Sequence, residues 1–315
     1  MNQKYEISVI CYAYNHEKYI RRALESFVNQ RVNVPFKVIV HDDASIDRTA
    51  EIIREYAEKY PSIIYPILQS ENQYSKGVYI LKKYIAKHVD TKYIAVCEGD
   101  DYWSDDNKLQ IQFDYMESHP EVVLCVHDTE RISEQGEQLN LFFNGKREDT
   151  EYTADEVIRR GGGGLFHTSS FFWRASAGLL VPDEFKIKGI GDYSQAIYLA
   201  SLGNVHYIGK VMSMYRTGSI NSWVSRTTKD KEKLCNHYYN QIDGLLNIDQ
   251  ATSQRYHASI NYAISTSLFK IAAIRADYSM VKNNKELNDY YKKQPIITKL
   301  KFIVKCCLKK VRLVK

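Results

Sequence analysis

Three carboxylates fall within four positions of the chain, Glu98, Asp100 and Asp101, directly after the apolar run 94–97. Asp and Glu are depleted in strands and costly to bury unpaired, so these side chains need solvent or a partner. Hard divalent cations such as Mg²⁺ and Mn²⁺ prefer oxygen ligands, and two carboxylates separated by one residue can address one ion from a strand end. The simpler alternative is a solvated turn in which Asp101 or Asp105 caps the helix that follows.

Further acidic residues stand where chemistry could use them. Asp42 and Asp43 end the apolar segment 36–43, and Asp192 follows Gly191 at the start of an apolar helical pattern. A carboxylate at a helix start can serve as an N-cap, and it can also take a proton from a hydroxyl as a general base. Both roles of Asp192 stay open from the residues alone.

Alternating strand and helix signals must position these groups. Four short runs rich in apolar residues predict strands: 5–14, 36–43, 65–70 and 92–99. Three segments with helical spacing lie between them: 16–30, 48–60 and 77–88. This order predicts an α/β fold with a mostly parallel central sheet flanked by helices, in which ligands bind beyond the carboxyl ends of the strands. Residues 223–295 are predicted to form a helical C-terminal region.

Composition places the chain among globular proteins, because 315 residues with 44% hydrophobic and 26% charged content can bury a sizeable core. No run reaches the roughly 18 apolar residues of a spanning helix, and the first residues lack the pattern of a secretory signal. Cys11, Cys97 and Cys125 lie in apolar runs without a CxxC pair, which indicates core residues rather than zinc ligands. A cytoplasmic protein is therefore expected.

The net charge of +5 belongs to the C-terminal tail, residues 296–315. This tail holds seven Lys or Arg and no acid, whereas the rest of the chain carries 36 basic against 38 acidic residues. Leu300, Ile303 and Val304 fall on one side of a helix there and basic residues on another, which predicts attachment to the anionic cytoplasmic face of a membrane. A helix that packs on its own domain with a solvated basic face is the alternative.

Three ordered blocks of the sequence resemble the nucleotide-sugar-binding half of family 2 glycosyltransferases, which are inverting enzymes with the GT-A fold. The blocks are SVICYAYNHEKYIRRALESFVNQ, VIVHDDASIDRTAEIIREYA and YIAVCEGDDYWSDDNKLQIQFDYM. The resemblance implies a glycosyltransferase domain over 1–222, with a nucleotide-sugar half of about 1–128 and an acceptor half of about 129–222. The helical region 223–295 and the basic amphipathic tail complete the predicted organisation.

The resemblance also implies roles for single residues of the donor side. Asp100 falls on the family's metal motif and is the predicted ligand of Mn²⁺ or Mg²⁺, whereas Glu98 departs from the usual Asp and is predicted to contact the ribose or a water. Asp43 could accept an imide N–H from a uracil or thymine ring, and a UDP-sugar is the expected donor. Further predicted nucleotide-sugar contacts are Ala13, Tyr14, Asp42, Asp101 and Lys76, the last of which could equally be an ordinary surface lysine.

The acceptor side and a late loop carry the remaining predictions. Asp192 matches the position of the family's catalytic base. The segment MYRTGSINSW (214–223) resembles a loop with the pattern Tyr-Arg-x-His, in which Arg216 fits as a phosphate contact but the histidine does not appear at Gly218. The predicted acceptor-side residues are His167, Thr168 and Trp103, with a structural role as the alternative for the histidine and core packing for the tryptophan.

Together these residues predict transfer of a sugar from a nucleoside-diphosphate sugar to a hydroxyl of a saccharide acceptor, and a membrane-attached tail would suit a lipid-linked one. A sugar nucleotidyltransferase is one alternative, but it would carry a glycine-rich phosphate loop after the first strand, and YAYNHEKYIRR has no glycine. A non-enzymatic basic module that docks on a membrane is another alternative, but it does not explain the acidic residues at the strand ends. No nucleic-acid partner is expected.

Overall fold

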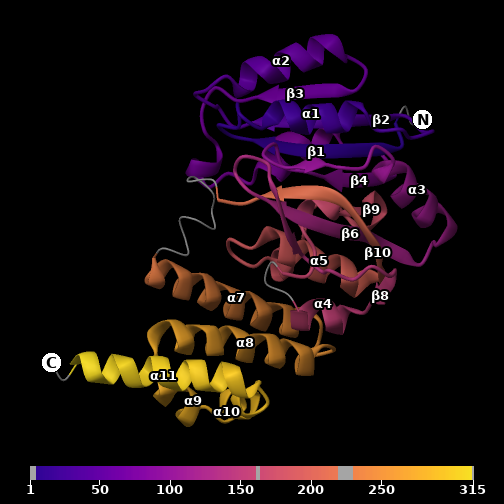
Figure 1. Cartoon of the computed structure of the whole chain (residues 1–315). Helices are drawn as coiled ribbons and strands as arrows, with labels where there is room; N and C mark the ends of the chain where they lie inside the picture. The colour runs from indigo at the N-terminus through magenta and orange to yellow at the C-terminus, as the bar shows by residue number, and fades with distance from the viewer. Residues whose placement is uncertain (1–4, 161–163, 219–229, 314–315) are drawn as a thin grey trace. The chain divides into compact units, whose positions relative to one another are not determined.

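The structure, a computed structural model, describes residues 5–160, 164–218 and 230–313, with side chains through residue 309 (Figure 1). The chain forms two compact units whose segments interleave along the sequence. The first unit comprises 1–154, 163–181 and 198–218, and the second comprises 155–162, 182–197 and 219–315. The predicted boundary at residue 222 lies outside the described residues and stays a prediction.

A mixed sheet forms the centre of the first unit. Its strand order is β3-β2-β1-β4-β9-β6-β10-β5, with β7 paired to β6 and β8 paired to β10. The predicted parallel arrangement holds for the four strands β3, β2, β1 and β4, whereas β9 runs antiparallel to both β4 and β6. The strands are β1 (Ile7–Ala13), β2 (Phe36–Asp42), β3 (Ile64–Leu68), β4 (Tyr93–Val96), β5 (Tyr102–Trp103), β6 (Val122–Ile132), β7 (Gln138–Phe142), β8 (Thr150–Tyr152), β9 (Phe172–Arg174) and β10 (Asn204–Arg216).

Helices α1 (Ile20–Val28), α2 (Thr49–Lys59) and α3 (Lys108–Ser118) accompany this sheet. The helix expected over 77–88 is instead a π-helical turn, η2 (Leu81–Ile85), followed by a 3₁₀ turn, η3 (Ala86–His88). A tertiary contact holds this irregular segment, because the Tyr84 hydroxyl donates to Gln73 Oε1 at 2.8 Å. Side-chain contacts of this kind override local helical spacing.

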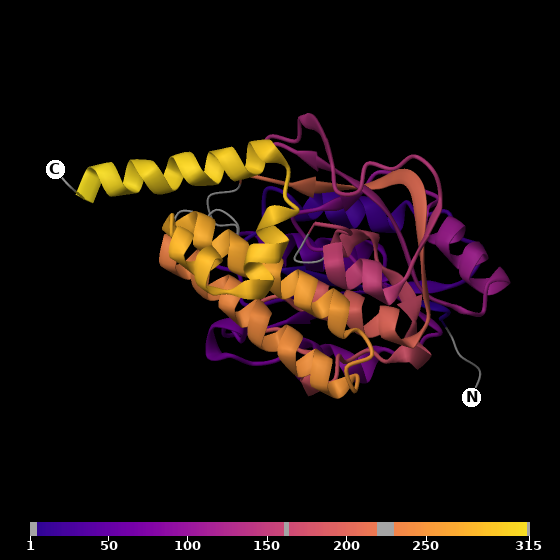
Figure 2. The same ribbon diagram turned by 90° about the horizontal axis from the view of Figure 1, so that it is seen from below.

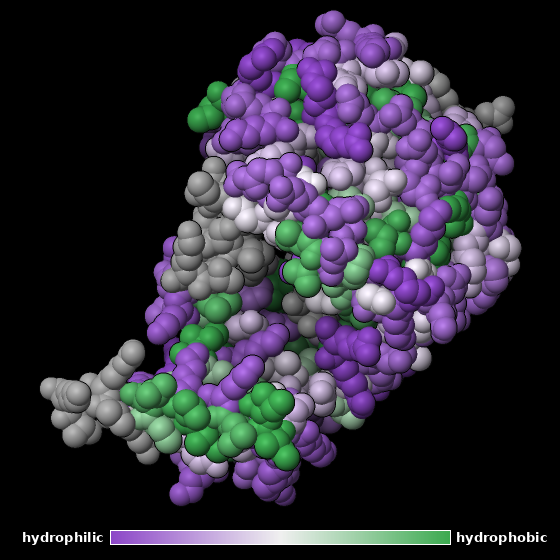
Figure 3. Space-filling model, in the orientation of Figure 1, coloured by the Kyte–Doolittle hydropathy of each residue, from purple (hydrophilic) through white to green (hydrophobic). Residues whose placement is uncertain are grey.

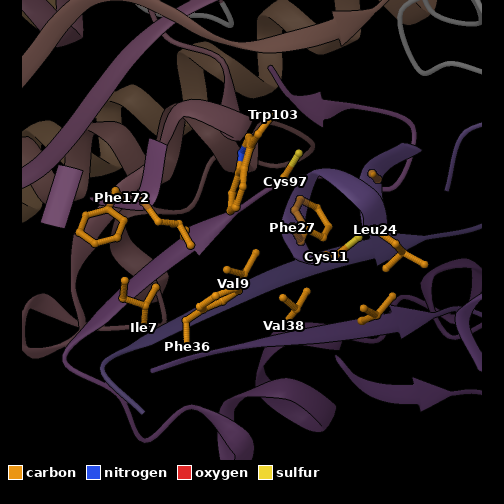
Figure 4. Packing of buried hydrophobic residues seen from close by; sticks show 14 of the residues in the cluster. Ile7, Val9, Cys11, Leu24, Phe27, Phe36, Val38, Cys97, Trp103 and Phe172 are labelled. Carbon is orange, nitrogen blue, oxygen red and sulfur yellow. The ribbon is translucent and has the colours of Figure 1, made fainter. Parts of the chain in front are cut away.

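Burial on both faces of β1 explains why this strand lies inside the sheet. Figure 4 shows Val9 and Cys11 packed with Leu24 and Phe27 of α1, in the same cluster as Trp103. The apolar residues of α1 repeat every three or four positions, so they share one face, and burying a side chain such as Phe27 stabilises the fold by about 1.5–3 kcal/mol. The described cysteines are free thiols, and Cys11, Cys97 and Cys125 are buried as predicted.

The second unit is helical. Helices α7 (Lys231–Ala251) and α8 (His257–Arg275) run side by side in Figures 1 and 2, and the shorter α9 (Tyr278–Asn283) and α10 (Lys285–Lys292) precede α11 (Ile296–Leu313). Earlier segments of the chain join these helices: a β-carbon at Gly244 of α7 would lie 2.6 Å from Ile187 Cγ1. Helices α4 (Ala154–Arg160) and α5 (Gly191–Leu202) each contribute residues to both units.

Candidate active site

The turn that follows β4 is held against the end of β1 by backbone hydrogen bonds. Cys97 N donates to Ile10 O at 3.0 Å, and Gly99 N donates to Tyr12 O at 2.8 Å. Glycine is required at position 99 by space, because an added β-carbon would lie 2.8 Å from Ile20 Cδ1 and 3.2 Å from Tyr12 O. The side chains on either side of Gly99 are therefore fixed at the carboxyl end of two adjacent parallel strands.

Glu98, Asp100 and Asp101, here called the acidic cluster, each present one carboxylate oxygen such that the three oxygens lie within 4.8 Å of one another. Asp101 Oδ1 accepts a hydrogen bond from Arg216 N at 2.9 Å, whereas Asp101 Oδ2 and Asp100 Oδ1 are buried and, among the described residues, receive no hydrogen bond. Burial, followed by the charges of Asp100 and Glu98, raises the pKa of the Asp101 carboxyl well above its usual range. Oxygen-only ligands with unsatisfied buried atoms fit a hard divalent cation such as Mg²⁺ or Mn²⁺.

The alternative of a helix-capping turn is wrong for Asp101, because its carboxylate bonds to Arg216 rather than to the start of α3. Asp105 does not cap the helix either: its Oδ1 accepts a hydrogen bond from Asn107 N at 2.8 Å, and Asn107, the residue at the N-cap position of α3, makes no side-chain capping bond. The acidic cluster is thus separate from the helix cap.

Two histidines flank the acidic cluster, and sequence reasoning missed the first. His16 Nε2 lies 3.9 Å from Asp100 Oδ2, and its only signal in the sequence is a position three residues beyond the end of β1. His167 Nε2 lies 3.7 Å from Asp101 Oδ2. Its Nδ1 faces the backbone of the following turn and lies 3.3 Å from Ser169 N.

Burial lowers the pKa of His167 to about 3, so this imidazole is neutral at physiological pH. Its Nδ1 also lies 2.7 Å from Ser169 Oγ, and Ser169 Oγ donates to Ser213 Oγ at 2.8 Å. The predicted acceptor-side residue His167 therefore lies in a buried polar network behind Asp101. Its neighbour Thr168 is half-buried at the start of the 3₁₀ turn η4 (Thr168–Ser170).

The acidic pair at the end of β2 fastens two neighbouring loops. Asp42 accepts hydrogen bonds from the backbone and hydroxyl of Ser45. Asp43 accepts one from Gln73 N at 2.8 Å through Oδ1 and one from Tyr74 N at 3.0 Å through Oδ2. Each oxygen of a carboxylate can accept more than one hydrogen bond, so the predicted nucleoside contacts are still open to both residues.

Other predicted donor contacts lie around the same strand ends. Ala13 O accepts a hydrogen bond from Asp43 N at 3.0 Å, and the following Tyr14 is exposed. Lys76 forms a surface ion pair with Glu71. Such a pair contributes little to stability, so the ammonium group can exchange this partner for a phosphate at small cost.

Arg216 and Trp103 are both buried near the acidic cluster. The guanidinium group of Arg216 donates to Asp100 O at 3.1 Å and to two further backbone carbonyls, and its carbon lies 4.4 Å from the centre of the Tyr19 ring. Trp103 is 2% exposed, its Nε1 donates to Ser169 O at 2.9 Å, and its ring packs on Phe27. Trp103 is thus a core residue in this structure, which was the alternative to its predicted contact with an acceptor.

Asp192 belongs to the second unit and lies in the first turn of α5, which begins at Gly191. Its Oδ1 accepts a hydrogen bond from Tyr193 N at 2.8 Å. Burial raises the pKa of the Asp192 carboxyl above its ordinary value, against the lowering effect of this hydrogen bond. A carboxylate with a raised pKa is a better proton acceptor, as a general base requires.

The sequence matches the Glycosyl transferase family 2 over residues 8–177. This region is more than half of the chain, so the protein belongs to that family, and the predicted membership is confirmed. An uncharacterized protein of Mycobacterium tuberculosis is 44% identical over 230 residues, which are 72% of this chain and 63% of the relative. The minor teichoic acid biosynthesis protein GgaB of Bacillus subtilis is 36% identical over 110 residues, 33% of this chain and 12% of GgaB.

Solved glycosyltransferases share the fold. The structure of TarS from S. aureus in complex with UDP superposes with a TM-score of 0.58 at 17% identity, covering 92% of this chain and 76% of that one. The mannosyltransferase PcManGT from Pyrobaculum calidifontis, in complex with GDP-Man and Mn²⁺, gives 0.51 at 15% identity and covers 98% and 88%. These likenesses confirm the predicted GT-A type of α/β fold.

Proposed function

We propose that the protein is an inverting glycosyltransferase that moves a sugar from a UDP-sugar to a hydroxyl of a saccharide acceptor, in the synthesis of a cell-surface polysaccharide. The observation that carries the proposal is the acidic cluster at the end of β4, with buried oxygens of Asp100 and Asp101 that receive no hydrogen bond from the described residues. Family membership supports transfer chemistry. The UDP complex of TarS and the name of GgaB support the choice of donor and product.

On the donor side, Asp100 would hold Mn²⁺ or Mg²⁺, and Glu98 would contact the ribose or a water molecule. A divalent cation there supplies positive charge that stabilises the leaving diphosphate. Asp43 would accept the imide N–H of uracil beside the backbone of Ala13 and Tyr14. Further proposed donor contacts are Asp42, Asp101 and Lys76.

On the acceptor side, Asp192 would act as the base. It would take the proton of the acceptor hydroxyl while that oxygen forms a bond to the anomeric carbon and the bond from this carbon to the diphosphate breaks. The electron pair of the broken bond leaves with the nucleotide, and a single displacement inverts the anomeric configuration. The acceptor-side roles of His167 and Thr168 stay predictions. Because Trp103 lies in the core, it can affect acceptor binding only through other residues.

The test is a screen of nucleotide sugars for release of the diphosphate, with and without Mn²⁺. We expect UDP to be released from one UDP-sugar, in a reaction that stops on addition of a chelator and in the Asp100→Ala variant. Arg48→Lys, a change at an exposed residue that pairs with Glu51, serves as the control and should behave as the wild type. Failure of every nucleotide sugar to bind or react would refute the proposed function.

The C-terminal helix supports a proposed attachment to membranes. Among the described residues, no helix combines the length and apolarity needed to span a bilayer. Helix α11 packs on its own unit through Phe302 and Cys306, which join Phe269 of α8 and Tyr291 of α10 in a small core. The opposite side exposes a row of apolar side chains, here called the apolar ridge and seen in green along α11 in Figure 3: Ile296, Ile297, Leu300, Ile303, Val304 and Leu308.

The packing alternative thus describes one face of the helix, whereas membrane attachment through the exposed face stays a proposal. The exposed Lys301 and Lys305 accompany the apolar ridge. We expect the full chain to sediment with anionic vesicles at low salt and to be released as salt rises, because each basic residue near anionic lipid contributes about 1 kcal/mol. Leu300→Ser combined with Val304→Ser should abolish sedimentation, and equal binding of this variant would refute membrane attachment through the ridge.

A further inference from the structure

Arg216, the last residue of β10, is tied to the acidic cluster through two different groups. Its backbone N–H donates to Asp101 Oδ1 at 2.9 Å, and its side-chain Nε donates to Asp100 O at 3.1 Å. One residue of a distant strand thereby fixes both the side chain of Asp101 and the peptide group of Asp100.

The guanidinium group of Arg216 is itself held in place. Its Nη1 donates to Ser133 O at 3.3 Å and to Glu134 O at 2.8 Å, in the turn after β6. The Tyr19 ring lies against the guanidinium carbon at 4.4 Å, and the Tyr19 hydroxyl donates to Glu134 Oε1 at 3.2 Å. Arg216 is 7% exposed, so its position is determined on several sides by protein atoms.

These contacts indicate that the guanidinium group of Arg216 holds the backbone in place and does not bind a phosphate. A carbonyl oxygen can accept a hydrogen bond but cannot donate one. Three such oxygens accept from the guanidinium group of Arg216, whose planar shape fixes the directions of its N–H donors. The geometry points to Arg216 as a positioning residue, which orients Asp100 and Asp101 for cation binding rather than contacting the diphosphate. This inference rests on the proposed function and refines it.

The two roles of Arg216 predict different losses in a variant. A positioning residue affects the cation site even when no nucleotide is present, and loss of such an outer partner typically lowers metal affinity about 10–100-fold. A phosphate contact affects only the binding of the nucleotide. Mn²⁺ affinity measured without nucleotide therefore separates them.

The experiment uses the full chain and follows the electron paramagnetic resonance signal of free Mn²⁺, with and without UDP. Arg216→Lys keeps the charge but replaces the planar fork by a single nitrogen, which cannot occupy the positions of both Nε and Nη1, so we expect its Mn²⁺ affinity without UDP to fall about tenfold or more. Turnover should recover at saturating Mn²⁺, which appears as a raised half-saturating concentration with kcat largely restored. Arg48→Lys is the matched control and should bind Mn²⁺ as the wild type does.

A second pair of variants tests how Arg216 is held in place while leaving Arg216 itself unchanged. Tyr19→Phe keeps the ring against the guanidinium group and should retain Mn²⁺ affinity within about threefold, whereas Tyr19→Ala removes the ring and should weaken it in the same direction as Arg216→Lys. Normal Mn²⁺ affinity of Arg216→Lys together with weaker UDP binding would overturn the inference and assign Arg216 to the phosphates. Absence of both Mn²⁺ and UDP binding in the wild type would overturn the proposed function as well.

Discussion

Replacement of Gly99 by alanine is the most direct test of how the acidic cluster is held in place. The added β-carbon would lie 2.8 Å from Ile20 Cδ1, 3.0 Å from His16 Nδ1 and 3.2 Å from Tyr12 O. The backbone of Gly99 is not in the left-handed region, so the conflict is one of space alone. We expect the turn to move away from β1, with a loss of about 1–3 kcal/mol in the free energy of unfolding and weaker Mn²⁺ binding.

A double-mutant cycle isolates the shortest of these contacts. Ile20→Val removes the Cδ1 methyl group and should by itself cost about 0.5–1.5 kcal/mol. If the contact at 2.8 Å causes most of the strain, Gly99→Ala should cost less in the Ile20→Val background than in the wild type. A coupling of about 0.5–2 kcal/mol is expected for residues in direct contact.

Urea denaturation gives the free energies, and titration with Mn²⁺ gives the readout at the site. The reasoning is refuted if Gly99→Ala unfolds at the wild-type urea concentration and binds Mn²⁺ normally. If the losses in the free energy of unfolding are additive in the double variant, the contact with Ile20 causes no strain, and the contacts with Tyr12 O and His16 Nδ1 cause it instead.

Three further changes test other parts of the site. Asp100→Ala should abolish metal-dependent transfer without changing the thermal unfolding midpoint by more than a few degrees, and a folded variant with unchanged transfer would remove Asp100 from the cation site. Asp192→Asn should lower transfer roughly 10²-fold or more while donor binding survives. Burial raises the pKa of Asp192, and a general base must be deprotonated, so kcat/KM of the wild type should fall as the pH drops through that raised pKa. If Asp192→Asn turns over like the wild type and shows the same pH profile, Asp192 has only a structural role. Asp43→Asn can serve only one of the amides of Gln73 and Tyr74, so urea denaturation should show a loss of about 1–3 kcal/mol, and an unchanged midpoint would mean that the loop is held elsewhere.

Periodicity and composition predicted the donor-side strands because local pattern and burial agree there. The apolar residues of β1 and β2 are buried along nearly their whole length, so their sequences read directly as strands of a central sheet. The segment 77–88 could not be predicted in the same way, since the bond from Tyr84 to Gln73 is tertiary and leaves no periodic signal. The antiparallel insertion of β9 between β4 and β6 is likewise a matter of topology rather than of local pattern.

The site shows the same division. Carboxylates at strand ends predicted the acidic cluster, because the ends of neighbouring parallel strands must meet at one edge of a sheet. His16 was missed because it stands in a loop with no spacing rule, and its approach to Asp100 depends on the close packing of Gly99. The bonds from Arg216 to the carbonyls of Asp100 and Glu134 join segments more than 80 residues apart, which no local pattern records.

The interleaving of the two units limits how this protein can be taken apart. The chain passes between the units at 154–155, 162–163, 181–182, 197–198 and 218–219, so neither unit is one continuous stretch of the gene. Truncation after residue 218 would keep residues 182–187 but remove α7, against which Ile187 packs so closely that Gly244 has no room for a β-carbon. Recombination at any one of these five positions would replace some segments of a unit and keep others. Exchange of the C-terminal half of this protein would therefore separate segments that belong to the same unit.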